Sequence, residues 1–252
     1  DSANKQDVEY VTGYEDYMDA VGNYPLYYAI RESFCTGTRQ GSMNTLNSFI
    51  QNMQKKFKKP EYMGIWLGNH DKERFLYQCS LGYRSKGLRN LVVFTFFFKG
   101  IPIFYYGDEQ YLDSGGNYDK RRQPLFGNYD EESDLYQLIK TVNQVRKDYN
   151  IFELDVTTKY VDADFYVYMR GKDIMIAVGK GLTRTIEIED HGLNDDDKFC
   201  NKLKAGDCIS VKDDILTIRM DGEPKIYLRK SVGKMIYVSS YLFLFLILLA
   251  LF

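Results

Sequence analysis

The sequence lacks an excess of positive charge. It contains 33 Lys and Arg residues against 35 Asp and Glu residues, so its formal net charge is −2. A chain without a basic field has no long-range attraction for a phosphate backbone, so this balance argues against a nucleic-acid-binding function. The sequence also shows no internal repeat and no low-complexity linker.

Cysteine is scarce, and its spacing lacks the patterns of a metal or redox site. Cys35, Cys79, Cys200 and Cys208 form neither a zinc-ligand pattern nor a CxxC pair. Cys200 and Cys208 are close enough in sequence to bridge a hairpin, which would imply an oxidising compartment. For Cys35 and Cys79, buried free thiols are an equally good interpretation.

Apolar residues, by contrast, are plentiful. The chain is 252 residues long and 44% hydrophobic, which is enough to bury at least one ordinary core and predicts one or two domains. It carries 22 Tyr and 16 Phe but a single Trp. Such aromatics suit a packed fold and equally suit surfaces that stack on sugar rings, so composition does not choose between these uses.

The two ends of the chain differ in character. Residues 1–7 are polar and carry neither an initiating Met nor the segments of a signal peptide, so we expect a chain that has lost its beginning. Residues 230–252 form a hydrophobic tail, whose apolar stretch from Met235 is marginal for spanning about 30 Å of hydrocarbon. A glycolipid-anchor signal and a membrane helix both remain open, and the lack of a basic residue after Phe252 favours the cleaved signal. Either would tether the protein to a membrane, facing the outside or a secretory lumen.

Helical and buried-strand patterns alternate in the first part of the chain. Gly41-Ser42 offers an N-cap for an amphipathic helix that Pro60 ends. Short apolar runs at Met63–Leu67 and Gly100–Gly107 predict buried strands, and residues 85–98 predict a helix between them.

Alternating buried strands and helices predict parallel pairing, as in α/β sheets and barrels. In such folds the chemistry lies at the carboxyl ends of the strands. Asn69-His70-Asp71 and Asp108-Glu109 directly follow the two predicted strands. These residues are therefore the candidates for a functional site, with Glu109 expected to brace its loop and Trp66 expected to lie in the core.

A second pattern begins after the last convincing helix, at residues 131–149. From Asn150 to Arg229 the hydrophobic period switches to two, and turns such as Arg170–Lys172 and Asp213-Asp214 separate the alternating runs. This pattern predicts an antiparallel β-sandwich domain over residues 150–229.

Several segments, in this order, resemble the second half of the α-amylases of glycoside hydrolase family 13, and most closely the fungal-type α-amylases. The similarity runs from about Val8 to Arg229, and the segments that carry it are Asn23–Pro25, Gly68–Asp71, Arg74-Phe75, Gly100–Gln110, Gly115–Asn117 and Arg122. The resemblance implies that residues 1–149 are the C-terminal part of a (β/α)8 TIM barrel, of the units after the fifth strand. It also implies an α-glucan substrate, a monomer, and calcium binding by ligands that lie mostly upstream, so no metal ligand is assigned here.

The same resemblance implies roles for individual residues. Asp71 matches a third essential carboxylate, which stabilises the transition state by holding sugar hydroxyls. His70 would donate to the same sugar, and Arg122 matches an arginine that contacts a more distant glucose unit. Tyr118 and Asp119 straddle the place of a family aspartate, so Asp119 is a candidate for substrate binding, although a solvated loop explains it equally well. Tyr111 could stack on sugar.

Two carboxylates of a retaining glycosidase are missing from the sequence. Such an enzyme needs a nucleophile and a proton donor about 5 Å apart. Gly87–Asn90 resembles the nucleophile motif Gly-x-Arg-x-Asp, but it follows the Asn-His-Asp corner and ends in Asn. The proton-donor Glu should fall at or just before Asp1, and Glu9 and Glu15 lie too far along. We therefore expect the chain to be inactive in isolation, as part of an endo-acting α-amylase. A non-catalytic, membrane-tethered amylase-like scaffold is the alternative, and a sugar-binding module built on residues 150–229 is a third interpretation.

Overall fold

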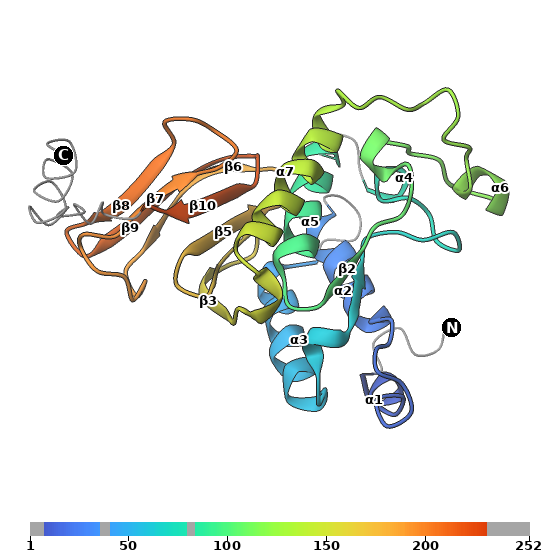
Figure 1. Cartoon of the computed structure of the whole chain (residues 1–252), viewed down its shortest axis with the longest axis horizontal. Helices are drawn as coiled ribbons and strands as arrows, with labels where there is room; N and C mark the ends of the chain where they lie inside the picture. The colour runs from blue at the N-terminus through green and yellow to red at the C-terminus, as the bar shows by residue number, and fades with distance from the viewer. Residues whose placement is uncertain (1–7, 36–40, 80–83, 231–252) are drawn as a thin grey trace, which may run out of the picture.

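The computed structural model describes residues 8–35, 41–79 and 84–230 (Figure 1). Within these ranges no helix has both the length and the apolar character that a bilayer crossing requires. The hydrophobic tail predicted at residues 230–252 lies, apart from Lys230, outside the described residues, and so do residues 1–7.

Short helices and two short strands make up the first part of the chain. The elements are α1 Val8–Thr12, α2 Tyr24–Phe34, α3 Met43–Lys56, η1 Pro60–Tyr62, β1 Gly64–Trp66, α4 Phe75–Gln78, α5 Arg84–Phe97, β2 Ile101–Ile103, η2 Asp108–Gln110, α6 Tyr118–Arg121 and α7 Asp134–Asp148. Strands β1 and β2 pair in parallel, with Gly64 opposite Ile101. A further parallel bridge joins Gly22 to Gly64. The predicted parallel pairing is therefore confirmed, although both strands are shorter than the apolar runs that predicted them.

Side-chain caps start the two longer N-terminal helices. The Asn23 carboxamide oxygen accepts the backbone N–H of Leu26 at 3.0 Å, with Pro25 in the first turn of α2. The Ser42 hydroxyl accepts the backbone N–H of Asn44 at 3.1 Å and caps α3, as the sequence predicted. Each cap satisfies a backbone donor that the helix leaves unpaired at its start.

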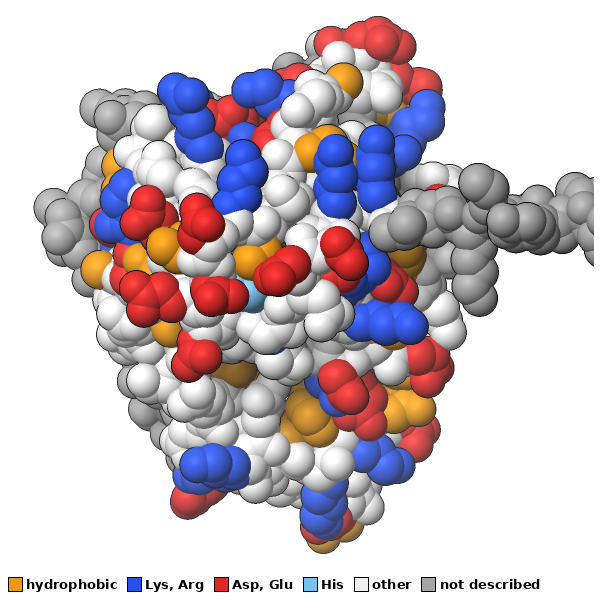
Figure 2. All heavy atoms as spheres, turned by 90° about the vertical axis from the view of Figure 1, so that its left-hand side faces the viewer, with side chains coloured by type: hydrophobic (Ala, Val, Ile, Leu, Met, Phe, Trp, Pro, Cys, Tyr) orange, Lys and Arg blue, Asp and Glu red, His pale blue; other side chains and the backbone are white. Residues whose placement is uncertain are grey.

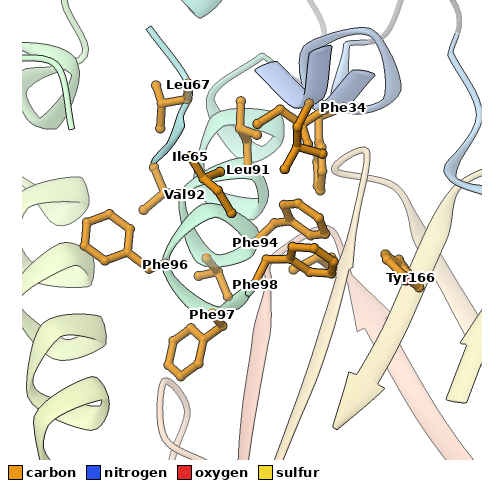
Figure 3. Packing of buried hydrophobic residues seen from close by; sticks show 14 of the residues in the cluster. Phe34, Ile65, Leu67, Leu91, Val92, Phe94, Phe96, Phe97, Phe98 and Tyr166 are labelled. Carbon is orange, nitrogen blue, oxygen red and sulfur yellow. The ribbon is translucent and has the colours of Figure 1, made fainter. Parts of the chain in front are cut away.

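Helix α5 is the centre of the main core. Its apolar residues lie on every side of the helix, which is typical of a fully buried helix. Figure 3 shows Phe94 and Phe98 side by side beneath Phe34 of α2, with Tyr166 of the large sheet nearby. The Phe94 and Phe98 rings stack with centroids 4.7 Å apart. Residues of α5 pack in one core with residues of β1, α2 and the C-terminal sheet. Since each buried phenylalanine stabilises the fold by about 1.5–3 kcal/mol, this packing holds the two parts of the chain together.

The second part of the chain is one antiparallel sheet of eight strands in the order β3-β4-β5-β10-β7-β8-β9-β6. After the single turn η3 Ile151–Glu153, the strands are β3 Val156–Val161, β4 Phe165–Arg170, β5 Ile174–Gly179, β6 Thr183–Ile188, β7 Lys198–Asn201, β8 Cys208–Lys212, β9 Ile215–Asp221 and β10 Lys225–Arg229. The predicted antiparallel strands are confirmed, but they form one ladder and not the two separate sheets of a sandwich. Strand β10 pairs with both β5 and β7, since Leu228 lies opposite Ile174 on one side and Cys200 on the other. The ladder is therefore continuous.

Both faces of the central strands are buried. In β4, Phe165, Val167 and Met169 belong to a second core, which residues of the sheet strands form among themselves. Tyr166 and Tyr168 of the same strand face α5 and the main core. Strand β4 ends at Arg170, which is 1% exposed and donates to the carbonyl of Phe97 at 2.6 Å. This contact satisfies an acceptor at the C-terminal end of α5.

The four cysteines form two disulfides. Cys35 at the end of α2 is bonded to Cys79 at the end of α4, and Cys200 of β7 is bonded to Cys208 of β8. The predicted hairpin bridge is confirmed. The alternative of free thiols at Cys35 and Cys79 was wrong, because the fold brings together two segments that are 44 residues apart in sequence.

Candidate active site

The Asn69-His70-Asp71 corner directly follows β1, and Asn69 shapes it. The Asn69 side-chain oxygen accepts the backbone N–H groups of Asp71 and Lys72, each at 3.0 Å. This is the pattern of an Asx turn, in which a side chain takes the place of a backbone acceptor. The amide nitrogen of Asn69 donates to the Tyr24 hydroxyl at 3.4 Å. The turn is thus defined locally and anchored to α2.

His70 and Asp71 project from this turn into solvent. Their side chains are 60% and 39% exposed, and His70 Nε2 lies 3.4 Å from Asp71 Oδ1. Both groups are close to each other and accessible, as residues that contact a sugar must be.

Arg122, the residue directly after α6, belongs to the same cluster. Its Nη2 atom lies 3.5 Å from Asp71 Oδ1, and its Nε donates to the backbone carbonyl of His70 at 3.4 Å. The structure therefore brings together three of the four residues that the sequence singled out. The fourth, Asp119, has an exposed side chain in α6, and its carboxylate makes no hydrogen bond to the described residues. Its role in substrate binding stays a prediction.

The sequence reasoning missed Arg121. Its Nη1 donates to the carbonyl of Asp71 at 2.6 Å, and its Nη2 donates to the carbonyl of Gly116 at 2.8 Å. The Glu73 carboxylate lies 4.0 Å from the same guanidinium. The only signal in the sequence was the pair Arg121-Arg122, of which a single member matched the family pattern.

Buried Arg31 supports the segment behind the corner. It is 4% exposed, and it donates to the carbonyls of Leu67 and of Glu73, the latter at 2.9 Å. It also donates to the Gln78 side chain at 2.6 Å. One side chain of α2 thereby holds the chain on both sides of the Asn-His-Asp turn, and the five donors of a guanidinium explain why arginine can do this.

A buried ion pair connects this segment to the loop after β2. Arg74 Nη1 lies 2.9 Å from Asp108 Oδ1, with exposures of 0% and 3% for the two side chains. Burial raises the pKa of Asp108 to about 6, against the opposing effect of Arg74. The carboxylate that braces this loop is therefore Asp108. Glu109, to which the sequence assigned that role, contributes its backbone carbonyl to the Ser133 hydroxyl at 3.2 Å.

Trp66 and Tyr111 are not presented as sugar platforms. Trp66 is 6% exposed and packs against the rings of Tyr24 and Tyr27, which confirms that it is a core residue. Tyr111 is half-buried beside Arg89, and burial raises its pKa to about 12. It lines a cavity of about 430 Å³ together with Asp134.

The donor set of the described residues does not fit a metal site. Across residues 8–35, 41–79 and 84–230, no three His, Cys, Asp or Glu side chains come together in a group that could hold a metal ion. Calcium coordination is therefore not assigned to any residue of these segments.

Known proteins with similar sequences and folds include α-amylases. Residues 2–123 match the family model of the α-amylase catalytic domain. Alpha-amylase 1 of Schwanniomyces occidentalis is 30% identical over 245 residues, which cover 90% of this chain and 46% of that protein. The structure of an α-amylase from Malbranchea cinnamomea superposes with a TM-score of 0.78 at 22% identity, covering 90% of this chain and 49% of the other. The α-amylase of Geobacillus thermoleovorans, solved with acarbose, gives a TM-score of 0.76 at 22% identity over 90% of this chain and 52% of the other.

The parallel strands, the corner and the antiparallel sheet together define a glycoside hydrolase fold of the α-amylase type. Through residues 2–123, the chain belongs to the α-amylase family. It spans about half the length of its relatives, 46% in the case of Alpha-amylase 1.

Proposed function

We propose that this chain is the part of a retaining α-amylase that holds the substrate sugar during cleavage of internal α-1,4-glucosidic bonds in starch or glycogen. The observation that carries the proposal is the exposed cluster of His70, Asp71 and Arg122 at the carboxyl end of β1, within the segment that matches the family.

Asp71 is the transition-state stabiliser in this proposal. Cleavage passes through an oxocarbenium-like state, and hydroxyl contacts that strengthen as this state forms lower the barrier by several kcal/mol. Arg122 and His70 both approach Oδ1 of Asp71, within 3.5 Å and 3.4 Å. They orient the carboxylate, while its Oδ2 atom makes no hydrogen bond to the described residues and is available to sugar hydroxyls. His70 donates to the same sugar, and Arg122 and Asp119 contact a more distant glucose unit.

The nucleophile and the proton donor come from elsewhere in the complete enzyme. The decoy motif ends at Asn90, which is fully buried in α5 and bonds to Gly179 and Gly222 of the sheet region. Glu9 pairs with Lys56, and Glu15 accepts backbone N–H groups at the end of α3. None of these groups is placed for catalysis, so we propose that the chain is inactive alone.

The remaining units of a (β/α)8 barrel would complete the parallel sheet. Among the described strands, β2 has a neighbour on one side only. Ile101 and Ile103 are 38% and 49% exposed, although isoleucines of this kind are usually buried. Further barrel strands would cover them, and any calcium site would lie with those strands.

We also propose a secretory location, extracellular or lumenal, with membrane attachment through the C-terminal tail. Two disulfides support an oxidising compartment, because such bonds rarely persist in the cytosol. We propose that the protein acts as a monomer on its α-glucan.

Substitution Asp71→Asn in the complete enzyme tests the proposal. We expect turnover of soluble starch to fall by about 100-fold or more, since several kcal/mol of stabilisation are lost and each 1.4 kcal/mol is tenfold. Asp119→Asn is the matched control, with a smaller loss. Thermal unfolding should be unchanged in both variants.

Near-normal turnover of Asp71→Asn would remove Asp71 from the mechanism. Starch hydrolysis by the purified 252-residue chain would refute its proposed inactivity. A complete protein that folds but hydrolyses no α-glucan would favour the non-catalytic scaffold.

A further inference from the structure

The outer face of α1 and of the turn after it is aromatic. Val8 and Val11 are buried, whereas Tyr10, Tyr14 and Tyr17 are 56%, 42% and 86% exposed. Their spacing of i, i+4 and i+7 places the three tyrosines on one side of a helical stretch. The solvent-facing side of a surface helix normally carries charged residues. A row of exposed aromatic rings therefore suggests a binding surface.

A hydrogen bond and a ring contact join the first two tyrosines of this row. The Tyr10 and Tyr14 hydroxyls lie 3.0 Å apart, and their rings meet edge to face with centroids 5.6 Å apart. The backbone continues the helical pattern after α1, since the N–H of Met18 donates to the carbonyl of Tyr14 at 2.9 Å. The row therefore extends from α1 into the turn after it, and can contact a short run of sugar units.

A polar cavity adjoins the row at Tyr17. It has a volume of about 300 Å³ and lies between the turn at Glu15–Asp19 and Lys58-Lys59, just after α3. This volume is at the lower end of the range for small-molecule sites. The Asp19 carboxylate lines the cavity and makes no hydrogen bond to the described residues.

Some of the charges around the cavity are already occupied by contacts within the protein. The two oxygens of Glu15 accept the backbone N–H groups of Lys58 and Lys59 at 3.1 and 3.0 Å. The Lys58 ammonium forms an ion pair with Asp16. These contacts tie the turn to the segment after α3, and among the described lining residues they leave the Asp19 carboxylate and the Lys59 ammonium without an ion pair. The remaining acceptor and donor carry opposite charges, so a neutral polyhydroxyl ligand, which can both donate and accept hydrogen bonds, suits the cavity better than an anion or a cation.

This surface lies away from the Asn-His-Asp corner. Residues 8–21 lead into Gly22, which bridges Gly64 at the amino end of β1, whereas the corner at residues 69–71 leaves the carboxyl end of that strand. Figure 1 shows α1 at the lower edge of the molecule, far from α4 and α6 at the upper right. A ligand on the tyrosine row would thus leave the corner unobstructed.

The C-terminal sheet offers no comparable row. Among the described residues, the exposed large apolar side chains all lie at or before Tyr129. Figure 2, which looks onto the sheet end of the molecule, shows acidic and basic side chains interspersed over that face. The expectation of a sugar-binding module on residues 150–229 therefore lacks the aromatic platform that such a module would use.

We propose that Tyr10, Tyr14 and Tyr17, with the adjoining cavity, form a second binding surface for an α-1,4-glucan chain, separate from the active site. The ring of Tyr17 stacks on the apolar face of a glucose unit, and Asp19 accepts hydrogen bonds from its hydroxyls. The inference rests on the α-glucan substrate class of the proposed function.

Affinity electrophoresis of the 252-residue chain in native gels with and without soluble starch tests this inference. We expect starch to retard the chain, and Tyr17→Ala to weaken this retardation by about fivefold or more, because a stacking ring is lost. Tyr17→Phe should keep most of the retardation, since it keeps the ring. Tyr129→Ala is the matched control: Tyr129 is 54% exposed on a different loop, and its loss should have no effect.

Equal retardation of the wild-type chain, Tyr17→Ala and the double variant Tyr10→Ala/Tyr14→Ala would overturn the inference. So would size-exclusion chromatography that shows a dimer of the chain lost on Tyr17→Ala, because a second copy would then cover the row. The proposed function is tested in a separate assay, the turnover of Asp71→Asn in the complete enzyme. Failure of the second binding surface can therefore be distinguished from failure of the proposed function.

Discussion

The guanidinium of Arg121 is hydrogen-bonded to the backbone carbonyl of Asp71, at a distance of 2.6 Å and across fifty residues of sequence. A second hydrogen bond from the same group reaches Gly116. The carboxylate of Asp71 therefore projects from a turn that is held from two sides, by Asn69 within the turn and by Arg121 from α6. Arg121 acts as a positioning residue in this arrangement.

Arg121→Met should loosen the corner without unfolding the protein. Hydrogen bonds to charged groups contribute about 1.5–3 kcal/mol, so the amides of Asp71 and Lys72 should exchange with deuterium about tenfold faster or more. Arg219→Met is a suitable control, because Arg219 is exposed and its side chain makes no hydrogen bond to the described residues. Unchanged exchange at Asp71 in Arg121→Met would show that Asn69 alone maintains the turn.

Asp108 should give the stability of the protein a defined pH dependence. Its pKa is about 6 in the folded protein, and its ordinary value is 3.8. The folded state thus binds the proton more tightly, and this contribution to stability is present below about pH 3.8 and is lost as the pH rises through about 6. Asp108→Asn, which mimics the protonated group, should abolish this dependence. Urea titration at several pH values gives the free energy of unfolding of the wild-type chain and of the variant. The difference between these two free energies measures the pH dependence that Asp108 contributes.

Between pH 4 and pH 7 that difference should change by up to about 3 kcal/mol in favour of the variant, since one pKa unit corresponds to about 1.4 kcal/mol. Asp119→Asn, at an exposed carboxylate, serves as the control and should follow the wild-type profile. A parallel course for wild type and Asp108→Asn would show that Arg74 fully compensates the burial of Asp108.

The two disulfides should differ in their effect on stability. Cys35–Cys79 closes a sequence separation of 44 residues and Cys200–Cys208 one of 8. In the chain-entropy description, their replacement by serine pairs costs about 4 kcal/mol and about 2.6 kcal/mol respectively. Urea unfolding of the two double variants measures this order. A larger loss for Cys200→Ser/Cys208→Ser would mean that native-state contacts of the hairpin outweigh loop entropy.

Local patterns were sufficient to predict the elements whose signals lie within a few residues. Ser42 caps α3 because its hydroxyl reaches an amide two residues away, and a short apolar run bounded by glycine became β1. The period of two in β4 and β5 also predicted strands correctly. Strand β7, with four residues and no long alternation, was indicated only by the possible Cys200–Cys208 hairpin, since its place depends on pairing with β10 and β8.

Contacts between distant segments decided the rest of the site. Arg121 and Arg122 are adjacent and chemically identical, and only the path of the chain from α6 directs one to the Asp71 carbonyl and the other to its carboxylate. Asp108 and Glu109 are likewise adjacent carboxylates, and burial beside Arg74 selects Asp108.

The sequence by itself determined the family, the change from alternating helices and buried strands to antiparallel strands, and the residues of the Asn69-His70-Asp71 corner, because these features depend on neighbouring residues and on motif spacing. The tertiary structure decided the continuous eight-stranded sheet, the Cys35–Cys79 bond and the two arginines at Asp71. Each of these depends on which segments meet in space, and that is set by the packing of α5 against both parts of the chain.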